Sequence, residues 1–74
     1  MRKIQPGKYR HFKGNQYQVI DIATHTETGE ALVIYRPLAD MGLLHARPLE
    51  MFASEVDRQK YPDVQQRYRF ERID

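Results

Sequence analysis

The chain has 74 residues, enough for one small domain and too few for a second hydrophobic core. With 41% hydrophobic and 30% charged residues, it has the composition of a globular protein and not of a disordered one. It has no cysteine, which excludes disulfides and thiolate chemistry, and its net charge is only +2. We expect a single domain over residues 1–74. The absence of a signal-peptide pattern and of a long apolar run favours a cytoplasmic location.

The first residues, 1–6, are basic and contain a proline, and we expect them to form a flexible start. Residues 7–12 show a short, imperfect alternation of apolar and polar side chains, which predicts an edge strand. A turn follows, in which Gly14 or Asn15 takes the left-handed backbone conformation.

Residues 17–36 form the most hydrophobic stretch of the chain. Two arms rich in β-branched and aromatic residues meet at Gly29, and this composition is typical of a β-hairpin. We prefer a three-residue loop with Gly29 left-handed, which pairs Ile34 with Ile22. This register gathers four aliphatic side chains on one face: Ile20, Ile22, Leu32 and Ile34.

A second register stays open at this point. A two-residue turn at Thr28 and Gly29 would place Asp21 opposite Arg36 as an ion pair. In either register Pro37 ends the hairpin, because proline has no amide hydrogen for the ladder. Both faces of the hairpin are partly apolar, which indicates a sheet that curls into a barrel.

The second half of the chain predicts short elements: a turn (40–42), a strand (43–47), a helical turn (48–56), a mobile loop (57–66) and a final strand (67–73). Leu49, Phe52 and Val56 recur three and four residues apart, which puts them on one helical face. We expect Phe12, Phe52 and Phe70 in the core. The sum is an all-β fold, a small SH3-like barrel of about five strands with one short helical turn.

Three stretches carry a family resemblance: residues 7–15 (GKYRHFKGN), residues 25–36 (HTETGEALVIYR) and residues 47–52 (RPLEMF). Together they resemble the small bacterial family catalogued as domain of unknown function 1653, over residues 7–73. The resemblance implies an SH3-type barrel. It implies no activity and no site residues, because the family is itself uncharacterised.

Nothing in the sequence predicts catalysis. His11, His25 and His45 lie 14 and 20 residues apart on different predicted elements, unlike the close spacing of short metal motifs. No hydroxyl lies in a nucleophile motif, and no glycine-rich phosphate loop is present. We expect no enzyme, no catalytic residue, no metal and no cofactor.

Binding is the better expectation. Tyrosine tolerates a wet rim while its ring packs, and arginines lie near three of the tyrosines. The predicted groove residues are Tyr9, Arg10, Tyr17, Tyr35, Arg36 and Arg47. Alternatively, these tyrosines close the barrel ends while the arginines pair with Glu50 or Asp21. Such a groove is typical of a small non-catalytic module that binds a peptide or protein.

Charge suggests a different ligand class. Residues 1–20 carry five basic groups and no acid, and residues 58–74 carry five basic groups and three acids. If the two ends lie side by side, they form a basic face, and the alternative function is weak nucleic-acid binding. A small hydrolase or metal protein is the least expected class. We expect no membrane partner and a monomer or weak dimer.

Overall fold

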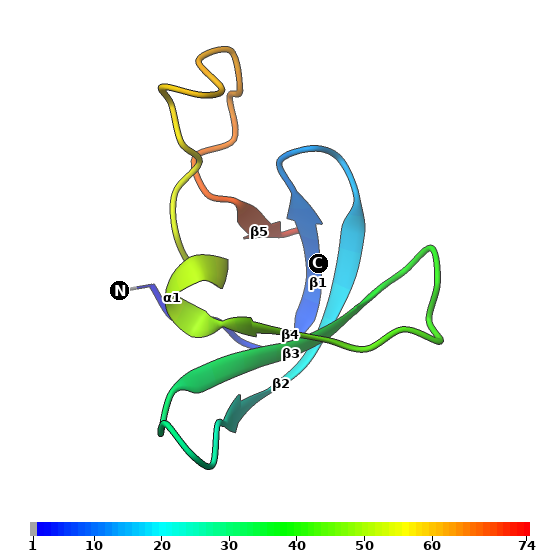
Figure 1. Cartoon of the computed structure of the whole chain (residues 1–74). Helices are drawn as coiled ribbons and strands as arrows, with labels where there is room; N and C mark the ends of the chain where they lie inside the picture. The colour runs from blue at the N-terminus through cyan, green and yellow to red at the C-terminus, as the bar shows by residue number, and fades with distance from the viewer. Residues whose placement is uncertain (1) are drawn as a thin grey trace.

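The computed structural model describes residues 2–74; Met1 lies outside it. Its elements are β1 (Gly7–His11), β2 (Gln16–Thr24), β3 (Ala31–Pro37), β4 (His45–Pro48), α1 (Leu49–Phe52) and β5 (Phe70–Arg72) (Figure 1). The strands form one sheet in the order β4-β3-β2-β1-β5, and all neighbours are antiparallel. This confirms a small all-β fold of five strands with one helical turn. The finer expectation, an SH3-like barrel, stays a prediction.

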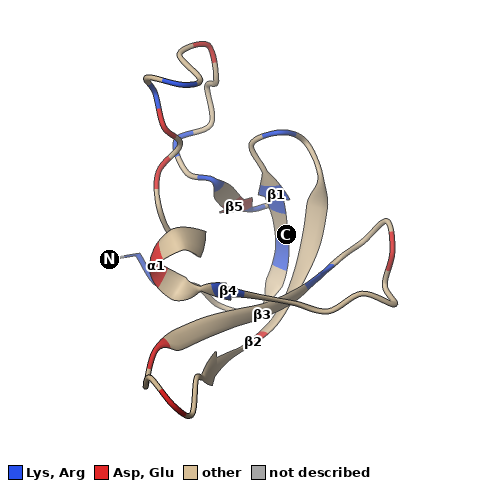
Figure 2. Cartoon of the chain, viewed as in Figure 1, with Lys and Arg blue, Asp and Glu red and all other residues tan. Residues whose placement is uncertain are grey.

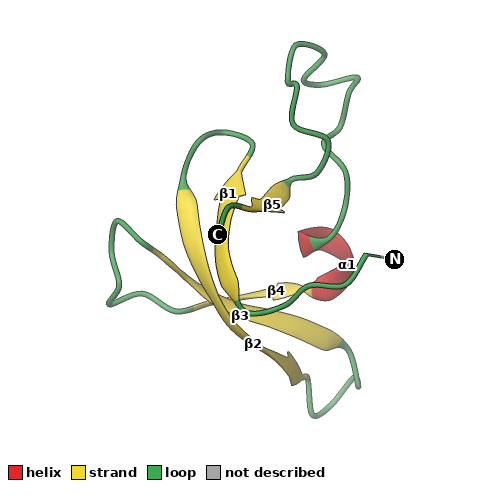
Figure 3. Cartoon of the chain, turned by 180° about the vertical axis from the view of Figure 1, so that it is seen from behind, coloured by secondary structure: helices red, strands yellow, loops and turns green. Residues whose placement is uncertain are grey.

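Residues 7–12 do not form an edge strand. β1 pairs with β2 on one side and with β5 on the other, so the edges of the sheet are β4 and β5. The alternation in residues 7–12 is weak, and the sequence does not reveal that the last strand returns beside the first. α1 lies between the two edge strands in both views of the chain (Figure 1, Figure 3).

The β2–β3 hairpin has a longer loop than we expected. The backbone amide of His25 donates to the carbonyl of Glu30 at 2.7 Å, which leaves residues 26–29 as the loop. Gly29 has a φ of 75°, so its left-handed conformation is confirmed. The three-residue loop is wrong. The Nδ1 atom of His25 accepts the backbone amides of loop residues 27 and 28. These hydrogen bonds stabilise a loop that is one residue longer than predicted.

A β-bulge at Ile20 sets which residues of the hairpin are buried. Val19 faces Tyr35 and Ile22 faces Val33, with a shift of register between the two pairs. Residues directly opposite each other point to the same side of a sheet. The bulge therefore turns Val19 and Ile22 to one face although they are three residues apart. Val19, Val33 and Tyr35 are buried there, and Ile22 packs against them.

Both expected registers are therefore wrong. The four aliphatic residues do not share a buried face: Ile20 is 40% exposed and the other three are half-buried. The alternative pairing also fails, because Asp21 faces Ile34 and not Arg36. An extra residue in one strand inverts the alternation beyond it.

The core is mainly aromatic. Phe52 of α1 and Phe70 of β5 are fully buried and stack with ring centroids 4.1 Å apart and planes 8° apart. The rings of Tyr9 and Tyr35 meet Phe52 edge-on at 5.5 and 5.3 Å. Phe52 and Phe70 are thus core residues as expected. Phe12 is not, because it is only half-buried.

The helical turn is shorter than expected, and Pro48 precedes it as the N-cap. Leu49 and Phe52 do face the sheet, and Val56 is buried beyond the end of the turn. The loop 57–66 projects from the sheet (Figure 1). Within it, the guanidinium of Arg58 donates to backbone carbonyls of residues 64 and 66. The mobility expected for this loop stays a prediction.

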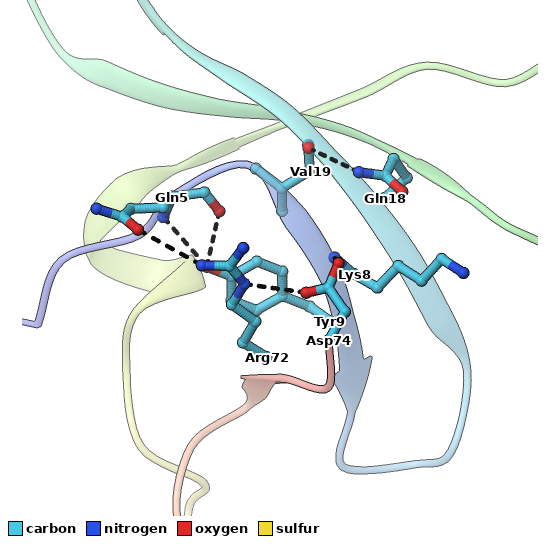
Figure 4. Close-up of polar contacts among 7 residues, drawn as sticks. All are labelled: Gln5, Lys8, Tyr9, Gln18, Val19, Arg72 and Asp74. Atoms are coloured by element: carbon cyan, nitrogen blue, oxygen red, sulfur yellow. Dashed lines mark hydrogen bonds and ion pairs between the residues drawn. The ribbon is translucent and has the colours of Figure 1, made fainter.

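Both ends of the chain lie against β1. The amide of Ile73 donates to the carbonyl of Lys8 at 2.9 Å, and Arg72 pairs with Asp74 at 3.0 Å (Figure 4). On the other side of Arg72, the Tyr9 hydroxyl donates to the carbonyl of Gln5 at 2.8 Å (Figure 4). Ile4, within the expected flexible start, is buried in the core. The flexibility of residues 1–6 is untested.

Across residues 2–74, the structure contains no helix with the length and apolar character needed to cross a bilayer. The cytoplasmic location stays a prediction.

Candidate binding surface

A groove of about 400 Å³ opens between the end of the sheet and α1. We call it the tyrosine groove. It lies at the β4 edge of the sheet, and β2, β3, β4 and α1 all contribute to it. Its lining residues are Tyr17, Tyr35, His45, Ala46, Arg47, Pro48 and Met51.

Two tyrosines and one arginine form the polar part of this groove. The rings of Tyr17 and Tyr35 meet edge-on with centroids 5.3 Å apart. The Nε of Arg47 donates to the Tyr35 hydroxyl at 3.1 Å. This bond orients the guanidinium and leaves its terminal nitrogens without a protein acceptor among residues 2–74. The groove therefore offers aromatic surface beside unused hydrogen-bond donors.

The structure brings three of the six expected groove residues together. Tyr17, Tyr35 and Arg47 lie together, whereas Tyr9 is buried at 3% exposure. Tyr9 faces the same side of the sheet, because it is paired with Tyr17, but it lies deeper. Its hydroxyl is used by the backbone of Gln5.

Arg10 and Arg36 also lie outside the groove. Arg10 alternates with Tyr9 on β1, so its side chain emerges on the opposite face and is exposed. Arg36 donates to the backbone carbonyl of Met41 at 2.9 Å, which holds it on the β3–β4 connection. Neither contacts Glu50 or Asp21 as an ion pair within residues 2–74.

Four groove residues were not predicted from the sequence: His45, Ala46, Pro48 and Met51. His45 is two residues before Arg47 on β4, and residues two apart in a strand share a face. The spacing of His45 and Arg47 could therefore have predicted that both line the groove. No sequence pattern predicts Met51 as a groove residue, because only the packing of α1 on the sheet shows which of its apolar side chains stays exposed. Met51 is 46% exposed.

A second hollow, of about 330 Å³, lies beside the first, and Arg47 lines both. We call it the basic cleft. It is enclosed by the end of β1, the β1–β2 turn and the loop that leads to β5. Its lining residues are His11, Phe12, Lys13, Arg47, Asp57, Lys60, Tyr61 and Arg69. The sequence did not predict this cleft, because its cations come from four separate segments.

His11 lies at the wall of the basic cleft, and its pKa is lowered. Burial is the main cause, and the charges of Arg47, Lys13 and Arg69 add to it. Its Nδ1 also accepts the backbone amide of Lys13 at 3.1 Å, which requires an unprotonated nitrogen. The imidazole is therefore neutral at physiological pH and adds no positive charge to the cleft.

This lowered pKa predicts a pH dependence of stability. Below an unfolded pKa of about 6.5, the unfolded chain binds a proton that the folded chain does not. The contribution of His11 is thus complete above that pH and is lost as the pH falls through the lower, folded value. Urea midpoints of the wild type and His11→Gln at about pH 7.5 and 5.5 test this. We expect the wild type to lose more stability; an equal loss in both would contradict the assignment.

The three histidines do not converge. His25 caps the β2–β3 loop through its Nδ1, His11 lies in the basic cleft, and His45 lies in the tyrosine groove. Among residues 2–74, no three side chains of histidine, cysteine, aspartate or glutamate are grouped so that they could hold a metal ion.

The fold and the two hollows define a small antiparallel β domain with an aromatic groove next to a cationic one. The family model described as "Protein of unknown function (DUF1653)" matches residues 7–72, and the chain belongs to this family. The resemblance found in the sequence is confirmed. A crystal structure of a DUF1653 protein from Bordetella bronchiseptica is 33% identical, with a TM-score of 0.79 over 99% of this chain and 91% of that one. No curated protein matches the chain.

Proposed function

We propose that this chain is a small non-catalytic binding module that holds an extended peptide segment of a protein partner in the tyrosine groove. The single observation that carries the proposal is the meeting of Tyr17, Tyr35 and Arg47 in one open groove. Aromatic walls next to preset donors suit a peptide, because the rings take an apolar side chain while the guanidinium takes a backbone carbonyl.

The exposed side chain of Met51 also supports peptide binding in the tyrosine groove. Met51 is a large apolar side chain that is 46% exposed at the margin of the groove. Methionine adapts its shape to different apolar partners, and its thioether packs well on aromatic rings. The groove also lies at the β4 edge of the sheet, where no further strand formed by residues 2–74 obstructs an incoming peptide.

Panning a display library of short random peptides on the purified chain tests this function. We expect enriched peptides to bind about tenfold more weakly to Tyr17→Ala, because loss of a central aromatic side chain costs roughly 1–2 kcal/mol. Met51→Glu should weaken binding as well, and it changes an exposed residue that the core does not need. The readout is fluorescence anisotropy with a labelled copy of the best peptide.

Tyr61→Ala is the matched control, since Tyr61 lines the basic cleft and not the groove. Circular dichroism establishes that each variant is folded. Two results would reject the peptide function: a library that enriches nothing above a protein-free column, or peptides that bind wild type, Tyr17→Ala and Met51→Glu equally well.

A further inference from the structure

Among the described residues, the cations of the basic cleft form no ion pair. Lys13, Lys60, Arg69 and Arg47 line it, and within residues 2–74 the only ion pairs are Arg67–Glu55 and Arg72–Asp74. The single acid at the cleft is Asp57, whose carboxylate accepts the backbone amides of Gln59 at 3.0 Å and Lys60 at 3.4 Å. Four positive charges thus line one hollow with a single carboxylate, and the cleft keeps an excess of positive charge.

Two of these cations lie near the same aromatic ring. The ammonium groups of Lys13 and Lys60 lie 5.4 and 5.6 Å from the ring centroid of Tyr61. Phe12 supports this ring edge-on at 4.9 Å. Hydrogen bonding and charge from Lys13, followed by Lys60, lower the pKa of the Tyr61 hydroxyl, although partial desolvation opposes the shift. The mouth of the cleft therefore presents several hydrogen-bond donors, and the electrostatic potential there is positive.

Charge is also separated along the molecule. The β1–β2 turn and the segment entering β5 carry cations, and the loop 57–66 beside them carries both cations and acids (Figure 2). The β2–β3 loop at the other end carries only acids, Glu27 and Glu30 (Figure 2). An incoming polyanion is attracted to one end and repelled from the other, which speeds encounter in the correct orientation. The basic cleft lies at the attracting end.

We propose that the basic cleft binds the phosphate backbone of single-stranded nucleic acid. A phosphorylated side chain carries about two negative charges, whereas four cations line this cleft, so a chain of phosphates matches it better than one phosphorylated side chain. Because the cations bind phosphate oxygens in this proposal, we expect the affinity to depend little on base sequence. The proposed site shares only Arg47 with the peptide function, which uses the neighbouring groove.

The test uses fluorescein-labelled oligouridylate and oligothymidylate, with binding followed by anisotropy at increasing salt. If about three phosphates are neutralised, the slope of log affinity against log salt is roughly −2 for a single strand. Affinity then falls about twentyfold between ~50 and ~200 mM salt. The two oligonucleotides should bind with similar affinity.

The double variant Lys13→Gln, Lys60→Gln removes two of the four cations from exposed loop positions, where the fold is not at risk. We expect the salt slope to shrink to roughly −0.7, as expected for about one remaining contact. Lys3→Gln, Lys8→Gln is the matched control, because it makes the same change of net charge at exposed positions outside the cleft. It should keep the wild-type slope.

Three results would overturn the proposal. The first is an absence of oligonucleotide binding at low salt. The second is an equal loss in the two double variants, which would indicate diffuse surface charge and not a defined site. The third is displacement of the oligonucleotide by a phosphoserine peptide at lower concentration than by inorganic phosphate, which would make a phosphoprotein the occupant. Wild-type binding by Met51→Glu would show that the cleft acts without the tyrosine groove.

Discussion

Replacing Phe70 by alanine is expected to lower the free energy of unfolding by about 3–5 kcal/mol. Phe70 is 1% exposed and stacks on Phe52, and the rings of Tyr17 and Tyr35 meet it edge-on at 5.6 and 5.9 Å. The cavity would lie at the centre of the core, where aromatic contacts from β2, β3 and α1 converge. Urea denaturation followed by circular dichroism measures the loss.

A small domain is marginally stable, and a loss of this size is comparable to its total stability. Phe70→Leu keeps part of the side-chain volume and gives a smaller, measurable loss. Phe12→Ala is the matched control. Phe12 is half-buried and packs on the half-buried loop residue Tyr61, so its loss should cost only about 1 kcal/mol. Equal midpoints for Phe12→Ala and Phe70→Leu would contradict the burial of the core described above.

Gly7→Ala is the second substitution with a large expected effect. Gly7 has a φ of 149°, which side chains of L-residues rarely allow. A Cβ there would lie 2.8 Å from Nε of Arg72 and 3.0 Å from Oδ1 of Asp74, so it would disturb the ion pair that closes the C-terminus onto β1 (Figure 4). We expect a loss of about 2–3 kcal/mol, combining backbone strain and displaced contacts.

Gly29→Ala separates these two causes. Gly29 has a φ of 75° and no atom within 4 Å of an added Cβ, so only the backbone term of about 1 kcal/mol applies. The double variant Gly7→Ala, Arg72→Ala removes the closest contact of the added Cβ and should recover part of the loss. Thermal or urea unfolding that ranks Gly29→Ala as the more damaging change would refute this account of Gly7.

Local patterns were sufficient for much of the fold. Alternating β-branched residues predicted the central hairpin, Gly29 its turn, and Pro37 its end. These features depend on the conformational preferences of residues that are neighbours in the chain, and those preferences can be read from the sequence. The burial of Phe52 and Phe70 also followed, because large aromatic side chains have few other stable places in so short a chain.

The register of the hairpin did not follow, because its loop has four residues and because Ile20 forms a bulge further along β2. An unpaired residue in one strand costs little locally, and no residue preference announces it. It reverses the alternation, so that Val19 and not Ile20 enters the core beside Tyr35. The same reversal brings Tyr17 beside Tyr35 and therefore creates half of the tyrosine groove.

The basic cleft shows the same division between local and long-range information. The basic ends of the chain were visible in the sequence, but Arg2 packs on the ring of Tyr68 and takes no part in the cleft. The cations that meet there include Arg47 from the middle of the chain. Their assembly depends on β5 returning beside β1.

Amino-acid order alone determined the all-β class, the hairpin with its glycine turn, the aromatic core and the family. These properties depend on composition and on spacings of a few residues. Tertiary structure decided which tyrosines stay accessible, which arginines face a groove, and that four distant cations share a hollow. Such features depend on contacts between segments that are far apart in the sequence. Their energies come from packing and from Coulomb interactions between those segments, and a short window of sequence does not contain both partners.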